Sequence, residues 1–255
     1  MVRCWVLFLV SFFCLPLFSQ DDGMVKSYVV NGVSFDMVRV SGGSFKMGAQ
    51  KSDRMSANYD SLAWPAESPV REVRVSDYMI GKTEVTQALW NAVMERNPSR
   101  FKDDNRPVER LFYEDIEAFI FRLNEMTGEA FRLPTEEEWE FAARGGSASD
   151  HLLYAGSDDY DQVAVCLENY GGRTDSTAPV MSKAPNVLGV YDMSGNVWER
   201  CQGGFRNYYS EETDDAANVI RGGSWGYGYT SCRVSSRLSY GFDSRCSNVG
   251  FRLAR

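Results

Sequence analysis

Residues 131–146 read FRLPTEEEWEFAARGG, a stretch that contains a complete set of helix signals. Thr135 and Glu138 match a T-x-x-E capping box, in which each side chain accepts a hydrogen bond from the other residue's backbone. The three consecutive glutamates place negative charge at the positive end of the helix dipole. Trp139 and two alanines form the apolar face, and a Gly-Gly pair ends the helix. The stretch therefore predicts a short, capped helix that buries its tryptophan.

Two further helices are predicted on the N-terminal side of this stretch. Thr86 is a good N-cap for a helix whose apolar residues share one face, and Asn97-Pro98 is expected to stop it. The second helix has apolar residues at i, i+3, i+4 and i+7 between Ile116 and Leu123, and ends at Thr127-Gly128.

The remaining patterns favour strands and loops. Residues 36–47 suggest two strands around Gly42-Gly43, residues 49–68 a long loop, and residues 70–75 one half-exposed strand. After Gly146 the chain is rich in Gly, Asn, Ser and Asp, so short strands tied by long loops are expected there. Helices and strands do not alternate regularly, which predicts an α+β fold and not a parallel sheet. We find no G-x-G-x-x-G after a strand and no Walker-type motif, so nucleotide binding is not predicted.

Charge and composition exclude several classes of site and partner. The chain has 255 residues, with 27 Lys and Arg against 35 Asp and Glu, so its formal net charge is −8. Nucleic-acid binders and anionic-membrane binders rely on surplus cations, so we expect neither function. The single histidine, His151, rules out a three-histidine zinc site within the chain. It lies in a Gly/Ser/Asp-rich stretch, and we expect it to be an exposed loop residue.

The N-terminal segment is predicted to direct export. Residues 1–20 read MVRCWVLFLVSFFCLPLFSQ, with Arg3 ahead of an almost unbroken apolar run. The run is short for a bilayer span and is followed by acidic residues, which is typical of a secretory signal peptide. We expect a signal peptide over residues 1–19, with lipidation of Cys14 as a hypothesis for a lipoprotein signal. The exported protein would lie at the cell surface, in the outer membrane or in the periplasm.

Four of the six cysteines lie beyond this segment: Cys166, Cys201, Cys232 and Cys246. None forms a C-x-x-C arrangement, so neither a zinc ribbon nor a thioredoxin-like motif is predicted. Export would permit disulfides. Four cysteines allow three full pairings, and the sequence does not choose among them.

Longer motifs follow one another in a fixed order across residues 35–255. They are VSGGSFKMG (40–48), KTEVT (82–86), PVE (107–109), RLPTEEEWE (132–140), YDMSGNVWE (191–199), RGGSW (221–225) and NVGFR (248–252). With these motifs the chain resembles the formylglycine-generating-enzyme (sulfatase-modifying factor) domain. The resemblance implies a single α+β domain of the C-type-lectin-like type, with little regular secondary structure.

The same resemblance implies a catalytic pair that this chain does not retain in full. In the enzymes two cysteines bind copper and engage the substrate, three and eight residues after the serine of the Gly-Gly-Ser motif. The matching residues here are Tyr227 and Cys232, counted from Ser224. Cu(I) favours two soft sulfur ligands, so copper binding is not expected and no catalytic residues are predicted. Ser224 and Cys232 become candidates only if the chain is an oxidase.

The resemblance also implies a calcium site. Asp192 and Glu199 would supply carboxylate oxygens, and Gly195 and Val197 backbone carbonyls, a mixed oxygen shell of the kind that Ca²⁺ accepts. The alternative interpretation is a tight turn whose tryptophan, Trp198, packs in the core.

Residues 226–247, hereafter the window, differ in composition from the motifs on either side. They read GYGYTSCRVSSRLSYGFDSRCS, with aromatic rings set among small polar residues. Rigid rings provide contact area at low entropic cost, and Ser and Gly provide adaptable loops, a mixture that paratopes use. The window therefore favours a binding face. Ordinary loop and core packing is the alternative.

The window also lacks Lys, Gln, Glu, Met and Trp, the residues that asparagine codons cannot reach by changes at their two adenines. In this respect it resembles the variable region of proteins that a retroelement diversifies through adenine mutagenesis, the treponemal variable protein being of this type. The resemblance implies that the ligand-binding positions lie among the following residues. They are Tyr227, Gly228, Tyr229, Ser231, Cys232, Ser239, Tyr240, Gly241, Phe242, Asp243, Ser244, Cys246 and Ser247.

These patterns together predict an exported, surface-displayed binding protein that is not an enzyme. Its partner would be another protein or a cell-surface molecule, held by the window on a rigid scaffold. Trp139, Trp198, Trp225 and Phe251 are expected to form the core of that scaffold. A formylglycine-generating oxidase and a structural component of an envelope or secretion complex are the alternatives.

Overall fold

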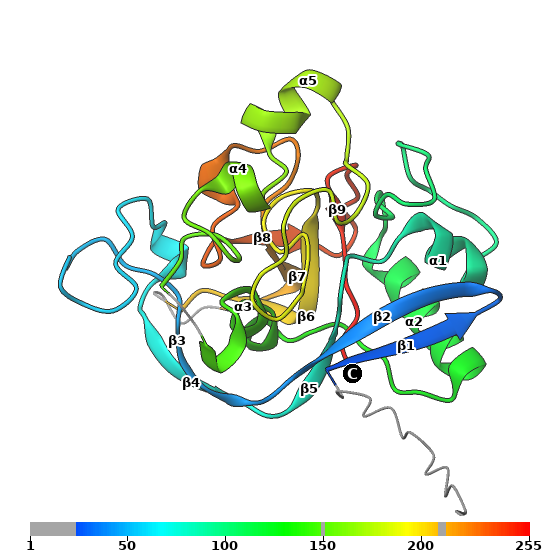
Figure 1. The fold of residues 1–255 in the computed structure, drawn as a ribbon, viewed down its shortest axis with the longest axis horizontal. Helices are drawn as coiled ribbons and strands as arrows, with labels where there is room; N and C mark the ends of the chain where they lie inside the picture. The colour runs from blue at the N-terminus through cyan, green and yellow to red at the C-terminus, as the bar shows by residue number, and fades with distance from the viewer. Residues whose placement is uncertain (1–23, 149–150, 209–212) are drawn as a thin grey trace, which may run out of the picture.

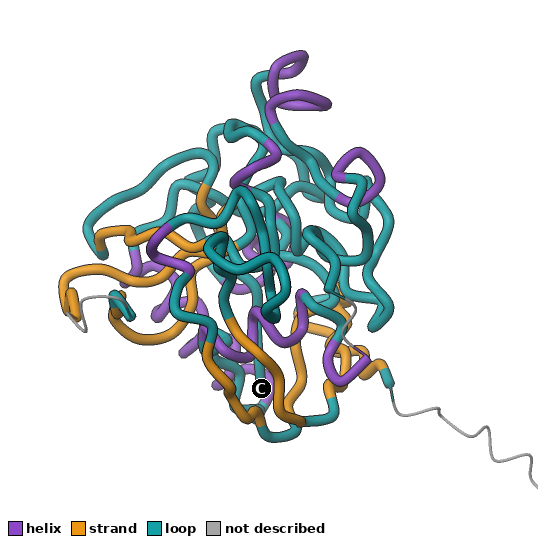
Figure 2. The backbone as a smooth tube through the Cα atoms, turned by 90° about the vertical axis from the view of Figure 1, so that its left-hand side faces the viewer, coloured by secondary structure: helices purple, strands orange, loops and turns teal. Residues whose placement is uncertain are grey.

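The structure is a computed structural model and describes residues 24–148, 151–208 and 213–255. The predicted signal peptide at 1–19 and its Cys14 lie outside the described residues. Helices and strands are joined by long loops, and loops make up most of the backbone trace (Figure 2). The main helices are α1 (Gln87–Val93), α2 (Tyr113–Thr127) and α3 (Glu136–Ala143). The short helical turns are Pro65–Glu67, Gly146–Ala148, α4 (Tyr160–Val163), Leu167–Gly171, α5 (Gly172–Thr174) and Tyr229–Ser231.

The described strands form three sheets. One has the order β1-β2-β5 and is antiparallel throughout, one is the antiparallel pair β3-β4, and the largest has the order β8-β7-β6-β9. In the largest sheet only the β6–β9 pair is parallel. The strands are β1 (Val25–Val30), β2 (Val33–Val40), β3 (Gly43–Met47), β4 (Arg71–Val75), β5 (Tyr78–Gly81), β6 (Trp198–Arg206), β7 (Thr213–Arg221), β8 (Arg237–Gly241) and β9 (Val249–Gly250).

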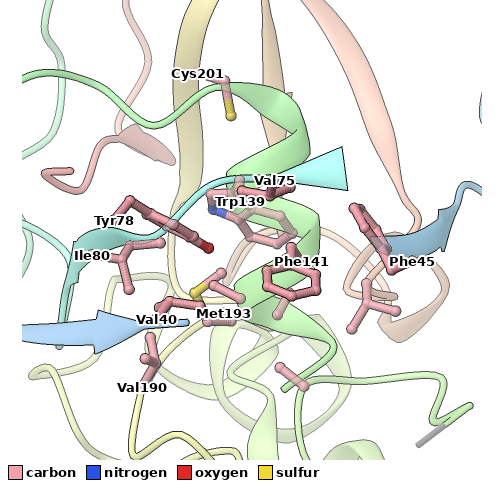
Figure 3. Close-up of a cluster of buried hydrophobic side chains, with 14 of the residues drawn as sticks. Val40, Phe45, Val75, Tyr78, Ile80, Trp139, Phe141, Val190, Met193 and Cys201 are labelled. Atoms are coloured by element: carbon pink, nitrogen blue, oxygen red, sulfur yellow. The ribbon is translucent and has the colours of Figure 1, made fainter. Parts of the chain in front are cut away.

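Helices α1 and α2 pack against the β1–β2 hairpin, while α3 lies at the centre between β3–β4 and the largest sheet (Figure 1). Trp139 and Phe141 of α3 are fully buried there, in a cluster with Phe45, Tyr78 and Met193 (Figure 3). The expected cap is present, because the Thr135 hydroxyl accepts from Glu138 N and the Glu138 carboxylate accepts from Thr135 N. The four predicted core residues, Trp139, Trp198, Trp225 and Phe251, are all buried.

The other sequence-based elements are close to their predicted positions. The two strands around Gly42-Gly43 are β2 and β3, residues 71–75 form β4, and α2 ends at a left-handed Gly128. Thr86 caps α1 as expected, but α1 ends at Val93, before the predicted stop at Asn97-Pro98. Beyond it the chain turns back, and the indole nitrogen of Trp90 donates to the carbonyl of Arg96 over 2.7 Å. That tertiary contact replaces the last helical turn.

The second half of the chain matches the expected loop-rich character between residues 151 and 197, all of which the structure describes and where only short helical turns interrupt the loops. The expectation of short strands is wrong for β6 and β7, which have nine residues each. Their burial explains why the sequence pattern was weak. The four residues at the start of β6 and the five at the end of β7 are buried on both faces, so polar and apolar residues do not alternate.

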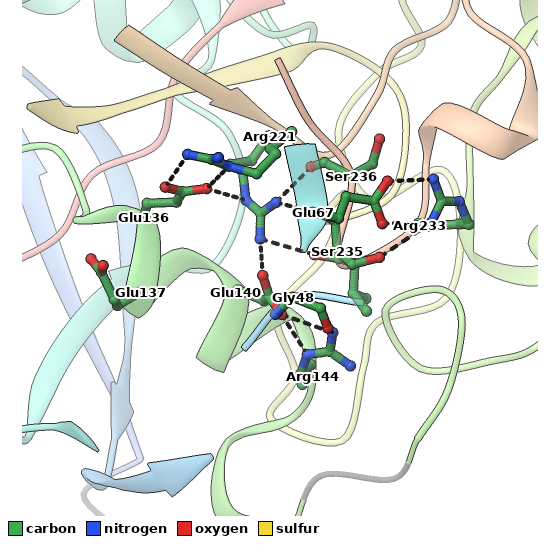
Figure 4. Close-up of polar contacts among 12 residues, drawn as sticks. Gly48, Glu67, Glu136, Glu137, Glu140, Arg144, Arg221, Arg233, Ser235 and Ser236 are labelled. Atoms are coloured by element: carbon green, nitrogen blue, oxygen red, sulfur yellow. Dashed lines mark hydrogen bonds and ion pairs between the residues drawn. The ribbon is translucent and has the colours of Figure 1, made fainter. Parts of the chain in front are cut away.

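Four arginines in the C-terminal third of the chain form buried ion pairs with glutamates, three of which lie earlier in the chain than that third. Arg221 contacts Glu140 of α3 and donates to the carbonyls of Ser235 and Ser236 over 2.8 and 2.7 Å (Figure 4). Similar pairs join Arg233 to Glu67, Arg237 to Glu136 and Arg252 to Glu199, each at 2.6 Å. Burial opposes ionisation of Glu140, but the charges of Arg144 and Arg221 outweigh it and hold the pKa of this carboxyl below its usual range.

The largest sheet therefore has two chemically different faces. Glu199, Arg221 and Arg237 point toward α3, where they form the ion pairs. Because side chains alternate along a strand, their neighbours Trp198, Arg200, Ile220, Leu238 and Tyr240 point the other way. We call this second side the outer face.

Candidate binding site at the C-terminal window

Burial divides the window into three parts. Residues 231–237 are buried throughout, whereas 226–230 and 238–247 keep exposed or half-buried side chains. The buried middle contains Arg233 and Arg237, whose guanidinium groups pair with Glu67 and Glu136. Only the two ends of the window can therefore contribute to a binding face.

Both ends of the window pack against one buried cluster of the outer face, formed by Trp198, Ile220 and Val249. The ring of Tyr227, which is 40% exposed, stands edge-on to Trp198 with 5.6 Å between ring centroids. Tyr240, thirteen residues further along the chain, packs against the same cluster.

Arg200 extends this surface toward the start of α2. Its guanidinium lies 4.6 Å from the centroid of the Tyr240 ring and 5.9 Å from that of Tyr113. It also donates to the carbonyls of Gly241 and Ser244 over 3.0 and 2.8 Å, and burial lowers its pKa to about 10.

The ring of Phe242 completes the surface by packing on Tyr113, with 4.8 Å between centroids. Tyr113, Tyr227, Tyr240 and Phe242 form one group of rings around Trp198 and Arg200, hereafter the aromatic patch. Burial, followed by the charge of Glu117, raises the pKa of Tyr113, so its hydroxyl stays protonated at neutral pH.

A pocket of about 640 Å³ lies beside the patch, and both ends of the window line it. Gly226 comes from one end, and Arg245, Cys246 and Ser247 come from the other. Arg100 and Arg110 also line this basic pocket, together with Asp175, which lies 3.9 Å from Arg100. Arg110 and Arg245 form no ion pair with any described residue. Two arginines are thus available to a ligand in a protein of negative net charge.

A second pocket, which Phe242 lines, has the opposite charge. Its volume is about 600 Å³, and its lining includes Glu114, Glu117 and Asp243 beside Tyr113 and Phe242. The two ends of the window thus contribute to one basic pocket, and residues of the second end also contribute to an acidic one.

Not every residue of the predicted binding set belongs to this surface. Ser231 and Cys232 are 4% and 0% exposed, so the expectation that they line the surface is corrected: both lie inside the protein. Their burial follows from the inward path of residues 231–237. Ser239 is exposed but alternates with Tyr240 on β8 and points away from the outer face. Tyr229 stacks on Tyr160, with 5.0 Å between centroids, in a different cluster.

The remaining members of the set lie at or beside the aromatic patch or its pockets. They are Tyr227, Gly228, Tyr240, Gly241, Phe242, Asp243, Ser244, Cys246 and Ser247. Sequence reasoning missed Tyr113 and Arg110, because they come from a distant segment. That segment is tied to the window by backbone hydrogen bonds from Arg110 N to Cys246 O and from Tyr113 N to Phe242 O. Arg245 was also missed, although its place inside the window could have identified it.

The segment with the predicted calcium ligands is buried. Both oxygens of Glu199 receive hydrogen bonds from Arg252 over 2.6 Å, and one of them also accepts from the Trp139 indole. Asp192 accepts from Met181 N through one oxygen, while its other oxygen has no partner among the described residues. Arg252 already neutralises Glu199, so this carboxylate could bind calcium only if the ion pair opened. Calcium binding by Asp192, Gly195, Val197 and Glu199 stays a prediction.

Burial at the same place also raises the pKa of two carboxyls. The pKa of Asp192 rises to about 6, and that of Glu84 rises well above its usual range, through burial and the nearby charge of Asp192. Asn196 and the backbone of Val197 donate to Glu84 over 2.7 and 3.1 Å. These contacts favour the interpretation of residues 192–199 as a tight turn with a buried tryptophan.

The two positions that match the family's cysteine pair differ in their exposure to solvent. Tyr227 is at the surface, Cys232 is fully buried, and the buried Ser224 hydroxyl has no described partner. Cys232 shares a small buried cluster with Cys166, and the two thiols influence each other's pKa. Sequence spacing gave no sign of this, since the two cysteines come from different loops.

Three further observations concern the described part of the chain. His151 is exposed, as expected. None of the helices there combines the length and the apolar character that crossing a bilayer requires. Within the same residues, no cluster of three or more His, Cys, Asp and Glu side chains is arranged to hold a metal ion.

The proteins that this chain resembles carry names of several different functions. The chain is 31% identical to "Chaperone protein LppX" of Paenibacillus barcinonensis, over 88% of this chain and 90% of that protein. It is also 31% identical to the formylglycine-generating enzyme of Streptomyces coelicolor, over 85% and 88%. Among solved structures, Treponema denticola variable protein 1 superposes with a TM-score of 0.76 at 28% identity, covering 90% of this chain and 98% of that one.

These relatives share a fold and differ in their named functions, so likeness alone does not assign an activity. The fold is the mixed α+β, C-type-lectin-like fold of formylglycine-generating enzymes, with little regular secondary structure. The family profile described as "Sulfatase-modifying factor enzyme 1-like domain" matches residues 29–255. Its motifs cap α3 and build the ion-paired side of the largest sheet. They also supply Arg252, which pairs with Glu199. The chain therefore belongs to the sulfatase-modifying factor enzyme 1-like domain family.

Proposed function

We propose that this protein is an exported binding protein whose ligand face is formed by the two exposed ends of the window. The observation that carries the proposal is that residues 226–230 and 238–247 pack against the cluster containing Trp198 and line the same pocket. The apolar N-terminal segment supports export. The resemblance to variable proteins supports display at the cell surface. Attachment through a lipid on Cys14 would be its only contact with a membrane.

The composition of the aromatic patch suits recognition of another protein or of a cell-surface molecule. Rings with few rotatable bonds, such as Tyr227 and Phe242, give large contact areas at low entropic cost. The arginines of the basic pocket can form paired hydrogen bonds with carboxylates. A protein segment with an acidic group near an apolar side chain would match both features.

Diversification of the window can be tested in a growing population of the source organism. Deep sequencing of the gene region for residues 220–255 should find substitutions at adenine-derived codon positions of exposed residues such as Tyr227, Tyr240 and Phe242. The codons of Arg233 and Arg237 should stay fixed, because both residues carry buried ion pairs. A uniform sequence, or substitutions spread equally over the buried and exposed codons, would contradict diversification of a binding face.

Binding itself can be tested with a phage-displayed library of random peptides selected on the wild-type protein. Selected peptides should lose most of their binding to a Tyr227→Ala, Phe242→Ala double variant. Phe121→Ala is the matched control, because Phe121 is an exposed ring on α2 outside the patch. Equal loss in the control, or none in the double variant, would place the binding surface elsewhere.

A formylglycine-generating oxidase is the second candidate, because Cys166 supplies a second thiol beside Cys232. Two thiolates suit Cu(I), which would supply the oxidation chemistry when bound. Both thiols are fully buried, however, so a peptide could not reach Cys232 without opening of the protein. Incubation of a Cys-x-Pro-x-Arg peptide with protein, copper and oxygen, followed by mass spectrometry, tests this candidate. Conversion that is lost in Cys232→Ser and kept in Cys201→Ser would replace the binding proposal.

A further inference from the structure

Two of the four described cysteines share a small buried cluster. Cys166 and Cys232 are both 0% exposed and pack together with Tyr154, Val163 and Ala164. This cluster is separate from the main core around Trp139. The two thiols come from distant parts of the chain, and the sequence alone left their pairing open.

The two thiols belong to the same buried cluster, and each influences the ionisation of the other. The Cys232 sulfur also lies 3.9 Å from the carbonyl oxygen of Gly228. The interaction with Cys232 lowers the pKa of Cys166, whereas the same interaction, followed by burial, raises the pKa of Cys232. Cys166 is therefore the thiol that ionises first, and Cys232 is the one that holds its proton.

The other two described cysteines have different surroundings. Cys201 is fully buried in the main core cluster with Trp139, on the α3 side of the largest sheet. Cys246 is exposed and lines the basic pocket. The arrangement therefore favours a single bond between Cys166 and Cys232, with Cys201 and Cys246 left as free thiols.

We propose that Cys166 and Cys232 form a disulfide when the protein folds in an oxidising environment. A small-molecule disulfide such as oxidised glutathione serves as the two-electron oxidant. The Cys166 thiolate attacks one sulfur of the oxidant, which breaks its S–S bond and releases one thiolate. Cys232 then loses its proton and attacks the Cys166 sulfur, which forms the protein disulfide and releases the second thiolate.

The bond would fix one end of the window to the loop that follows α4. That contact already exists in non-covalent form, because Leu167 N donates to Tyr227 O over 2.9 Å and Tyr229 N donates to Glu168 over 3.0 Å. The stacked rings of Tyr160 and Tyr229 lie over the same contact. A disulfide at Cys232 would hold residues 226–232 in place whatever side chains stand at the exposed positions. The inference does not depend on the proposed binding function.

The test uses the full chain, refolded in a buffer of oxidised and reduced glutathione and then alkylated. Non-reducing peptide mapping by mass spectrometry should find Cys166 and Cys232 in one linked peptide, two hydrogens lighter than the two thiol peptides together. Cys201 and Cys246 should be alkylated. Alkylation of all four thiols, or linkage of Cys166 to another cysteine, would overturn the proposal.

A stability measurement provides a second readout. Because the disulfide would close a long loop, reduction of the wild-type protein should lower Tm by roughly 8–15 °C. Cys166→Ser and Cys232→Ser should show no such response to reductant, whereas the matched control Cys201→Ser should keep it. If the serine variants fail to fold, the peptide map and the reductant response of the wild type decide the question. The same Tm with and without reductant would contradict the proposal.

Discussion

The two faces of the largest sheet show how this fold separates stability from recognition. On the side of α3, Arg221 and Arg237 are buried and each is paired with a glutamate. On the outer face, Tyr227 and Tyr240 pack against the cluster containing Trp198 with part of their surface open to solvent. Removal of one partner from a buried ion pair is strongly destabilising, whereas changes at exposed positions have small effects. Substitutions on the α3 side should therefore change stability, whereas substitutions on the outer face should change binding.

The largest effect is expected for Arg221→Ala. The substitution would leave Arg144 as the remaining ion-pair partner of Glu140. It would also remove the donors to the carbonyls of Ser235 and Ser236. The free energy of unfolding should fall by up to about 5 kcal/mol, measured by urea denaturation. Arg74→Ala on β4 is the control, because Arg74 is exposed and should change stability by less than about 0.5 kcal/mol. Similar stability of both variants would contradict the role given to the ion-paired face.

Trp198→Ala tests the support beneath both ends of the window. Trp198 is 1% exposed and contacts Tyr227 and the Ile220 cluster, so its loss should destabilise the protein by about 3–5 kcal/mol. Thermal unfolding measures the effect. A smaller substitution, Trp198→Phe, should recover part of the stability. Wild-type stability of Trp198→Ala would show that the outer face does not rest on this residue.

Glu109→Gln should reveal a pH-dependent effect of intermediate size. Burial raises the pKa of Glu109 to about 7, and no described residue forms an ion pair with its carboxylate as Arg221 does with Glu140. The folded protein holds this proton more tightly than the unfolded chain, so stability from this group is present below about pH 4.5 and declines as the pH rises toward 7. Replacement by Gln should make the fall in the free energy of unfolding over this pH range smaller by about 1–3 kcal/mol.

Urea denaturation of wild type and Glu109→Gln at pH 5 and pH 8 measures this difference. Glu117→Gln is the control, because Glu117 is exposed and should leave the pH profile as in the wild type. Parallel pH profiles of wild type and Glu109→Gln would contradict the raised pKa.

The smallest effect is expected for Tyr227→Ala. The ring is 40% exposed and contributes one edge-on contact to Trp198, so stability should change by about 0.5–1 kcal/mol. Differential scanning calorimetry is sensitive enough for such a change. A loss as large as that of Trp198→Ala would mean that the exposed ends of the window are structural, and would remove the distinction between the two faces.

Much of the fold could be predicted from local chemistry. The capping box at Thr135, the apolar spacing of α2 and the alternation of β4 act between residues that are close in sequence, so short patterns were enough to identify them. The strands β6 and β7 could not be identified in this way. They are buried on both faces where they pair, and their polar residues are matched by partners far away in the chain.

The sequence by itself determined the family, the four core aromatics and the window as the unusual segment, because motifs and composition are properties of the chain. Only the tertiary structure decided which window residues reach the surface. It buried residues 231–237 by pairing Arg233 and Arg237 with distant glutamates, and it brought Cys166 to Cys232 and Tyr113 to Phe242. Such contacts depend on long-range packing and charge pairing, which no local sequence pattern encodes.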